Sequence, residues 1–141
     1  MTPNKKEASL AAKIPITDEA SLLKAGRKIM RLLRPEALLI TLGEEGMVLF
    51  DREGKRPIKI PTVAQEVFDV SGAGDTVIAT FTLARAAGAS FLEAATMANA
   101  AAGVVVGKVG IATCSPEELL RRMVDARKGT TAVRRTTSWT P

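Results

Sequence analysis

The apolar positions of this chain follow two different spacings near its N-terminus. In the segment TDEASLLKAGRKIMRLLR, which opens at Thr17, apolar residues fall mostly on one face of a helix, acids lead the first turn and Pro35 follows. The next segment, ALLITL (37–42), is an almost continuous apolar run. Such a run predicts a strand buried on both faces, as in a parallel sheet.

Shorter patterns predict the remaining elements. Asn4 followed by Glu7 predicts the start of a first short helix, and GEEG (43–46) predicts a turn. The segments MVLFD and RPIKIP, on either side of REGK, predict a hairpin. Three further helices are expected at about 73–87, from a capping box at Ser90–Glu93 to near Gly107, and from a capping box at Ser115–Glu118 to Gly129.

This order of elements predicts an α/β fold with α/β/α layers. The strands are few for a complete sheet, so we expect an incomplete sheet that belongs to a larger fold. Residues 1–129 form the predicted folded unit. Residues 130–141 have no periodicity and are expected to be a disordered tail.

Composition narrows the class of protein. The chain has 141 residues, 46% of them hydrophobic, which is enough for one domain with a core. No apolar run is long enough to span a membrane, and the N-terminus lacks the apolar region of a signal peptide. A single cysteine, Cys114, permits no internal disulfide and fits the reducing cytoplasm.

The net charge of +5 comes from the C-terminal end. The last fifteen residues contain four basic residues and no acid, which leaves 16 basic and 15 acidic residues elsewhere. Aromatic residues make up 4% of the chain and tyrosine is absent, so few side chains could stack on bases. We therefore expect a solvated basic tail and no nucleic-acid partner.

The most informative motif is DVSGAGD, residues 69–75, which precedes a predicted helix. Gly72, Ala73 and Gly74 leave backbone N–H groups accessible, and a helix start adds further free N–H groups. This combination predicts an anion site, most often for phosphate. Asp75 places a negative charge there, which suits a base that deprotonates an attacking hydroxyl. In isolation the motif is better explained as a glycine-rich helix start with Asp75 favouring the dipole.

The motif, together with other segments, resembles the pfkB (ribokinase-like) carbohydrate kinases. DVSGAGD followed by TVIATF is similar to the C-terminal signature of that family. TPNKKEA, LLITLGEEG and ANAAAGVVVGKVGIATCSPEEL resemble other family segments in the same order, so that the resemblance covers about residues 2–123. Within that family, the sequences of these segments are most similar to the branch that phosphorylates heptose 7-phosphate, a precursor of lipopolysaccharide core heptose.

The resemblance implies a reaction and roles for individual residues. The reaction is transfer of the ATP γ-phosphoryl group to a sugar hydroxyl, with Asp75 as catalytic base and Gly72, Ala73 and Gly74 as the anion hole. Asn4 and Glu7 would order Mg²⁺ through its waters, although a capping pair alone also explains them. With the other segments in register, the catalytic interpretation of GAGD is favoured over the helix-cap interpretation.

Further residues match the family's binding positions. Thr41 and Gly43 end the buried strand, where nucleotides bind in open α/β sheets, or they form an ordinary strand exit. Asn99 would lie beside the adenine, or face the surface. Four residues would surround a monovalent cation, K⁺ among the candidates: Asp69, Ser71, Gly110 and Cys114.

Two hypotheses from different classes follow. In the first, the chain is the C-terminal, nucleotide-binding half of a sugar kinase, inactive alone because the residues that bind the sugar phosphate belong to the missing N-terminal half. In the second, it is a non-catalytic nucleotide- or phosphate-binding module. An open strand edge and an apolar face further predict either a homo-oligomer or cover by the missing half.

Overall fold

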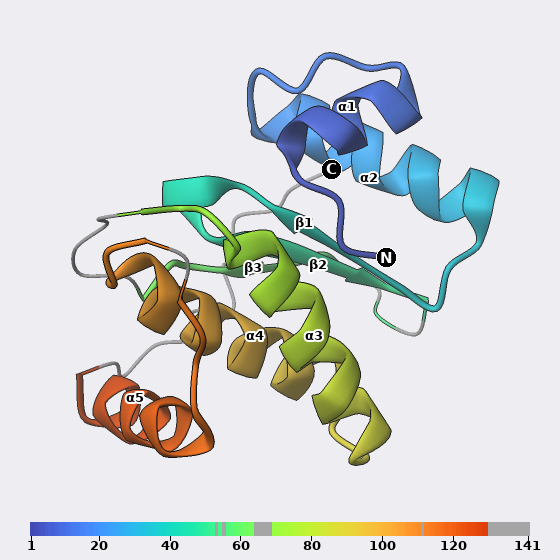
Figure 1. Cartoon of the computed structure of the whole chain (residues 1–141). Coiled ribbons are helices and arrows are strands. Elements are labelled where there is room, and N and C mark those ends of the chain that lie inside the picture. Colours follow the sequence, from blue (N-terminus) through green and yellow to red (C-terminus); the bar gives the residue numbers. More distant parts are fainter. Residues whose placement is uncertain (53, 55, 64–68, 111, 130–141) are drawn as a thin grey trace.

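A computed structural model describes residues 1–52, 54, 56–63, 69–110 and 112–129 of the chain (Figure 1). The elements in chain order are α1 (Lys5–Ala12), α2 (Glu19–Leu33), β1 (Ala37–Thr41), η1 (Gly43–Glu45, a 3₁₀ turn), β2 (Met47–Asp51), β3 (Ile58–Ile60), α3 (Ala73–Ala86), α4 (Phe91–Val106) and α5 (Pro116–Gly129). The predicted succession of elements is confirmed, and the predicted tail, residues 130–141, lies outside the described residues.

The sheet that these strands form is antiparallel, with the order β1-β2-β3. Ala37 pairs with Asp51 and Thr41 with Met47, while Leu49 pairs with Ile58. The expectation that β1 lies within a parallel sheet is therefore wrong for its pairing with β2. The connection through η1 is only five residues long, and so short a connection can join only antiparallel neighbours.

The other edge of β1 does carry parallel pairing, from the N-terminal segment. The N–H of Leu39 donates to Met1 O at 2.9 Å, and the N–H of Thr41 donates to Pro3 O at 3.0 Å. Asn4 and Thr41 form a parallel bridge. Residues 1–4 thus lie along this edge of β1, and they bring the start of α1 to the C-terminal end of the strand.

Helices cover both faces of the sheet, which explains why β1 is apolar throughout. Leu38 and Ile40 pack with α1 and α2, whereas Ala37 and Leu39 pack with α3 and α4. Figure 1 shows the two helical layers on opposite sides of β1 and β2, with α5 beside α4. The α/β/α layering is confirmed, around a sheet of three strands in the described part of the chain.

Side-chain caps define the helix starts where the sequence predicts them. Reciprocal capping bonds join Asn4 to Glu7 and Ser90 to Glu93, and Ser115 is joined to Glu118 in the same way. The second helix begins after Asp18 instead of Thr17, because the Asp18 carboxylate accepts the N–H of Ser21. Among the described residues, no helix is both long enough and apolar enough to cross a bilayer.

Candidate functional site

The N-terminus of α3 presents backbone N–H groups that have no acceptor within the described part of the chain. Gly72 caps the helix in the left-handed conformation, with φ of +77°, and offers no side-chain cap. The N–H of Ala73 donates to Val70 O at 3.2 Å, and that of Thr76 donates to Gly72 O at 3.0 Å. No bond between described residues uses the N–H of Gly74 or Asp75, so these groups can bind an anion.

Glycine serves different purposes at the two positions. Gly72 needs its positive φ, which residues with a side chain rarely adopt. Gly74 has no positive φ, and a Cβ built there would have no neighbour within 4 Å among the described residues. Neither the backbone conformation nor the packing of these residues requires glycine at position 74, and the space in front of it is available to a ligand.

A hollow of about 200 Å³ adjoins this helix start. It brings together five residues that the sequence analysis singled out: Thr41, Gly43, Ala73, Gly74 and Asn99. They come from the end of β1, from the turn η1, from α3 and from α4, four segments that are distant in the sequence. The fold therefore gathers the proposed strand-end, anion-hole and adenine-side residues around one space.

Asn99 is buried, with 4% of its surface exposed, so the alternative of a surface-facing Asn is wrong. Its side-chain Nδ2 donates to Pro61 O at 2.7 Å. The small neighbours Ala98 and Ala100 are buried as well, which lets α4 pack closely on α3 and the sheet. The Asn99 amide thus has a structural partner on the protein side while the residue lines the hollow.

Asn4 and Glu7 form the complete capping box of α1. The N–H of Asn4 donates to Glu7 Oε2 at 2.8 Å, and the N–H of Glu7 donates to Asn4 Oδ1 at 2.9 Å. Both residues are exposed, and the bridge to Thr41 holds Asn4 at the end of β1. The capping role is confirmed. The capping box uses only Oε2 of the Glu7 carboxylate and leaves Oε1 available. A water-mediated role of Glu7 with Mg²⁺ stays a prediction.

The residues proposed for a monovalent cation lie in the loops before α3 and after α4. Asp69 Oδ1 accepts the N–H of Ser71 at 2.8 Å, a bond that lowers the pKa of this carboxyl group. The Asp69 N–H donates to Val106 O at 3.3 Å and joins the loop before α3 to the end of α4. Gly110 has a φ of +78°. Within the described residues, no three His, Cys, Asp or Glu side chains cluster as a metal site.

Cys114 does not have the environment of a reactive thiol. Burial raises its pKa, and the nearby Glu118 carboxylate raises it further. Its Sγ donates to Ser115 O at 3.6 Å. Because the thiolate is the reactive form, the raised pKa leaves this cysteine without nucleophilic character at neutral pH.

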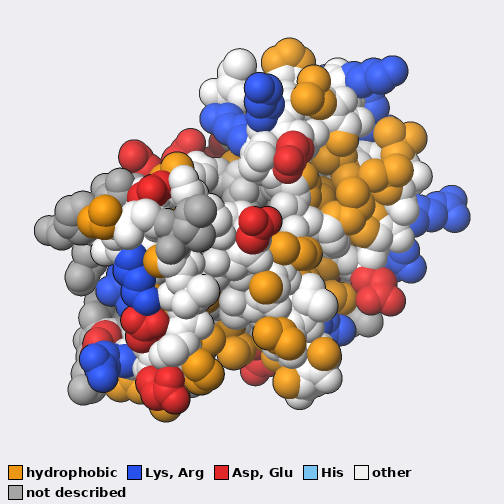
Figure 2. All heavy atoms as spheres, in the orientation of Figure 1, with side chains coloured by type: hydrophobic (Ala, Val, Ile, Leu, Met, Phe, Trp, Pro, Cys, Tyr) orange, Lys and Arg blue, Asp and Glu red, His pale blue; other side chains and the backbone are white. Residues whose placement is uncertain are grey.

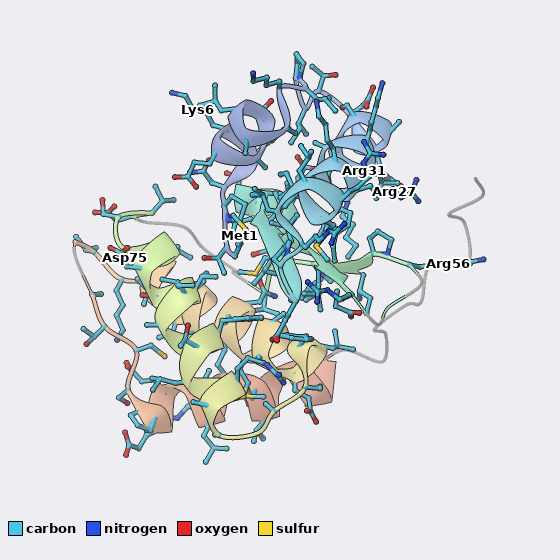
Figure 3. The ribbon with its side chains drawn as sticks, turned by 90° about the vertical axis from the view of Figure 1, so that its right-hand side faces the viewer. Met1, Lys6, Arg27, Arg31, Arg56 and Asp75 are labelled. Atoms are coloured by element: carbon cyan, nitrogen blue, oxygen red, sulfur yellow. The ribbon has the colours of Figure 1, made fainter. Side chains whose placement is uncertain are left out.

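Asp75 lies one residue beyond the lining of the hollow. Its side chain is exposed in the first turn of α3, and Figure 3 shows it at the N-terminal end of that helix. An exposed carboxylate beside free N–H groups could accept a proton from an incoming hydroxyl. It could also simply favour the positive end of the helix dipole.

Sequence analysis missed several residues of this hollow. The additional lining residues are Glu44, Gly46, Met47, Thr62, Val70, Val77, Ala102, Gly103 and Val106. Gly103 carried a signal, because it lies four residues after Asn99 and therefore on the same face of α4. Thr62 carried none, since only the return of the chain after β3 brings it to the hollow.

Residues 1–118 match the model of the pfkB family carbohydrate kinases. The bifunctional protein HldE of Geobacter metallireducens is 54% identical over 123 residues, which is 87% of this chain and 25% of that protein. HldE of Nitratiruptor sp. is 51% identical over 129 residues. The chain spans about a quarter of the length of these relatives.

Solved structures share the fold. The ribokinase of Arabidopsis thaliana, complexed with ribose and ATP, superposes with a TM-score of 0.78 at 30% identity, covering 86% of this chain and 39% of that one. Phosphofructokinase-2 of Escherichia coli, in complex with potassium, gives a TM-score of 0.80 at 24% identity and covers 89% and 40%. The layered arrangement described above is thus part of a ribokinase-like fold.

Proposed function

Because the chain belongs to the pfkB family of carbohydrate kinases, we propose that it supplies the nucleotide-binding and phosphoryl-transfer side of an ATP-dependent sugar kinase. The observation that carries the proposal is the hollow that joins the N-terminus of α3 to Thr41, Gly43 and Asn99. A nucleotide has an anionic and an apolar part. The hollow offers free N–H groups at one side and small apolar residues of α4 at the other.

The proposed chemistry needs a sugar hydroxyl beside Asp75. The carboxylate takes the hydroxyl proton while the oxygen attacks the γ-phosphorus, and the bond from that phosphorus to the β,γ-bridging oxygen breaks to release ADP. Of the predicted anion hole, the N–H groups of Gly72 and Gly74 would stabilise charge on the transferred group, together with that of Asp75. The N–H of Ala73 is not available for this, because it donates to Val70 O. Mg²⁺, ordered by Glu7 and Asn4 through water, would neutralise the phosphates when bound.

Heptose 7-phosphate is the proposed acceptor, and one observation supports it. The relatives that match at about 50% identity are HldE proteins. The groups that bind the acceptor would come from the rest of the longer protein. Apolar side chains exposed at the N-terminus, on α2 and on α3 could pack against that part: Met1, Leu32, Leu33, Ile78 and Leu83. Figure 2 shows hydrophobic side chains gathered at the upper right of this face, in the region of α2 and the N-terminus.

Calorimetric titration of the chain with ATP and Mg²⁺ tests the nucleotide half of this proposal. We expect saturable binding that Asn99→Leu weakens, because a leucine keeps the branched shape of the side chain and removes its polar amide. Absence of heat at millimolar nucleotide would contradict the proposal.

Phosphoryl transfer is tested in a full-length protein that contains this segment, with heptose 7-phosphate and fructose 6-phosphate as competing acceptors. Preference for the heptose supports the proposed substrate. Binding without turnover in the full-length protein would favour a non-catalytic nucleotide-binding module instead.

A further inference from the structure

A second hollow lies away from the candidate nucleotide site. It has a volume of about 460 Å³ and lies between the C-terminal half of α2 and the end of β2. Its lining contains four arginines: Arg27, Arg31, Arg34 and Arg52. Figure 3 shows Arg27 and Arg31 beside each other on α2, on the opposite side of the molecule from Asp75.

The positive charge of this hollow is not neutralised by described residues. Neither of the two ion pairs that join them, Lys5–Glu45 and Lys108–Glu118, involves these arginines. Asp51 is the one acidic residue of the described lining, and its Oδ1 already accepts the N–H of Gly54. Four arginines therefore line one space, with a single, partly engaged carboxylate among the described lining residues.

The helix C-terminus by itself does not explain why all four arginines stand at these positions. Cations near the last turn of α2 interact favourably with the helix dipole, which explains Arg31 and Arg34. Arg27 lies a turn earlier, at the i, i+4 position before Arg31, where like charges repel. Arg52 comes from a different part of the chain, directly after β2, and its guanidinium donates to Arg34 O. Arginines from two separate segments, the C-terminal part of α2 and the residue after β2, therefore line the same hollow.

The floor of the hollow is apolar. Phe50 is 4% exposed, and Met30 and Pro57 are half-buried beside it. The Phe50 ring occupies the space above Gly26, where a Cβ would lie 2.1 Å from its Cζ. The volume falls within the range of small-molecule sites, which combine apolar walls with a few charged groups that fix orientation. Guanidinium groups are the preferred partners of phosphate oxygens.

We propose that this arginine-lined hollow is a second anion site, which binds a small molecule carrying two or more phosphate charges. The hollow is separate from the GAGD helix start, and the proposal stands whether or not the chain takes part in phosphoryl transfer. Inorganic pyrophosphate and a nucleoside diphosphate present the same charged group. The apolar floor would favour the nucleoside diphosphate.

The test titrates the chain with inorganic pyrophosphate and, separately, with ADP, and follows backbone amide shifts by NMR. We expect pyrophosphate to shift the amides of 27–34 and 50–52. The variant R27Q/R31Q should weaken this binding at least about tenfold, since each charge-assisted hydrogen bond contributes substantially. The matched control K24Q/K28Q removes the same charge from the same helix, outside the lining, and should change affinity less than about twofold.

Two outcomes would overturn the proposal, and two others would identify the ligand. Equal weakening by both double variants would overturn it, because the effect would then be one of net charge. Shifts confined to 72–75 would also overturn it, because the anion would then occupy only the start of α3. Tighter binding of ADP than of pyrophosphate at 27–34 identifies a nucleotide as the ligand, whereas equal affinity identifies the phosphate group alone. Circular dichroism of both variants checks that the fold is retained.

Discussion

The side-chain amide of Asn99 donates a hydrogen bond to the carbonyl oxygen of Pro61 at a distance of 2.7 Å. This bond joins the middle of α4 to the residue that follows β3, 38 positions earlier in the chain. It fixes one wall of the candidate nucleotide hollow, because Thr62 and Asn99 both line that space.

Asn99→Ala should lower the free energy of unfolding by about 1–3 kcal/mol, because Pro61 O loses its partner in a buried setting. Thr96→Ala, on an exposed turn of the same helix, is the control and should change stability by less than about 0.5 kcal/mol. Urea denaturation of both variants measures the difference. Equal stabilities would show that the bond contributes nothing.

Alanine substitutions at Gly72 and Gly74 separate folding from binding. Gly72→Ala should cost about 1–2 kcal/mol of stability, because its φ of +77° is unfavourable for a residue with a Cβ. Gly74→Ala should leave stability unchanged or raise it, since its Cβ would meet open space. If phosphate approaches this glycine, Gly74→Ala weakens binding of ATP with Mg²⁺ by about tenfold, or 1.4 kcal/mol. Unchanged affinity would remove the anion-hole assignment from position 74.

Asp75→Asn tests the proposed catalytic base. In this chain, nucleotide affinity should stay the same or increase, because the variant removes a negative charge from beside the phosphates. In a full-length protein that contains the segment, turnover should fall by at least about 10²-fold, as is typical when a positioned base is lost. Steady-state kinetics with near-normal turnover would instead support the helix-cap role of Asp75.

The contact between Gly26 and Phe50 predicts a packing conflict. Gly26→Ala would place a methyl group within 2.1 Å of the Phe50 ring in the core between α2 and β2. We expect a loss of about 1–3 kcal/mol, even though alanine favours helices. In a Phe50→Leu background the same substitution should cost less. Strictly additive losses in thermal denaturation would contradict this steric explanation.

Glu93, the capping carboxylate of α4, predicts that the folded chain loses stability at acidic pH. The bond from the Ser90 N–H lowers the pKa of Glu93 below its ordinary value of 4.5. A carboxyl group whose folded-state pKa is lowered stabilises the fold above its ordinary pKa, and this contribution is lost as the pH falls through the folded-state value. Glu93→Gln keeps an acceptor for the cap, so its unfolding free energy should depend less on pH below about pH 5. Identical pH profiles for the variant and the parent chain would refute this prediction.

Local patterns determined the elements of this protein. The apolar run of β1, the capping pairs at Asn4, Ser90 and Ser115, and the glycine at position 72 act within a few residues, so their effects are visible in the sequence. The GAGD segment and its resemblance to sugar kinases are likewise visible in the sequence alone. The α/β/α layering followed from the order of the elements.

Long-range contacts were decided only by the tertiary structure. Nothing local shows that residues 1–4 lie parallel to β1 while β2 runs antiparallel to it, because pairing depends on which edges meet. The burial of Asn99 depends on Pro61, and the arginine-lined hollow depends on Arg52 returning beside Arg34. Sequence periodicity specifies which face of an element is apolar. Chain packing decides which polar groups share a space, because it brings together residues that are tens of positions apart.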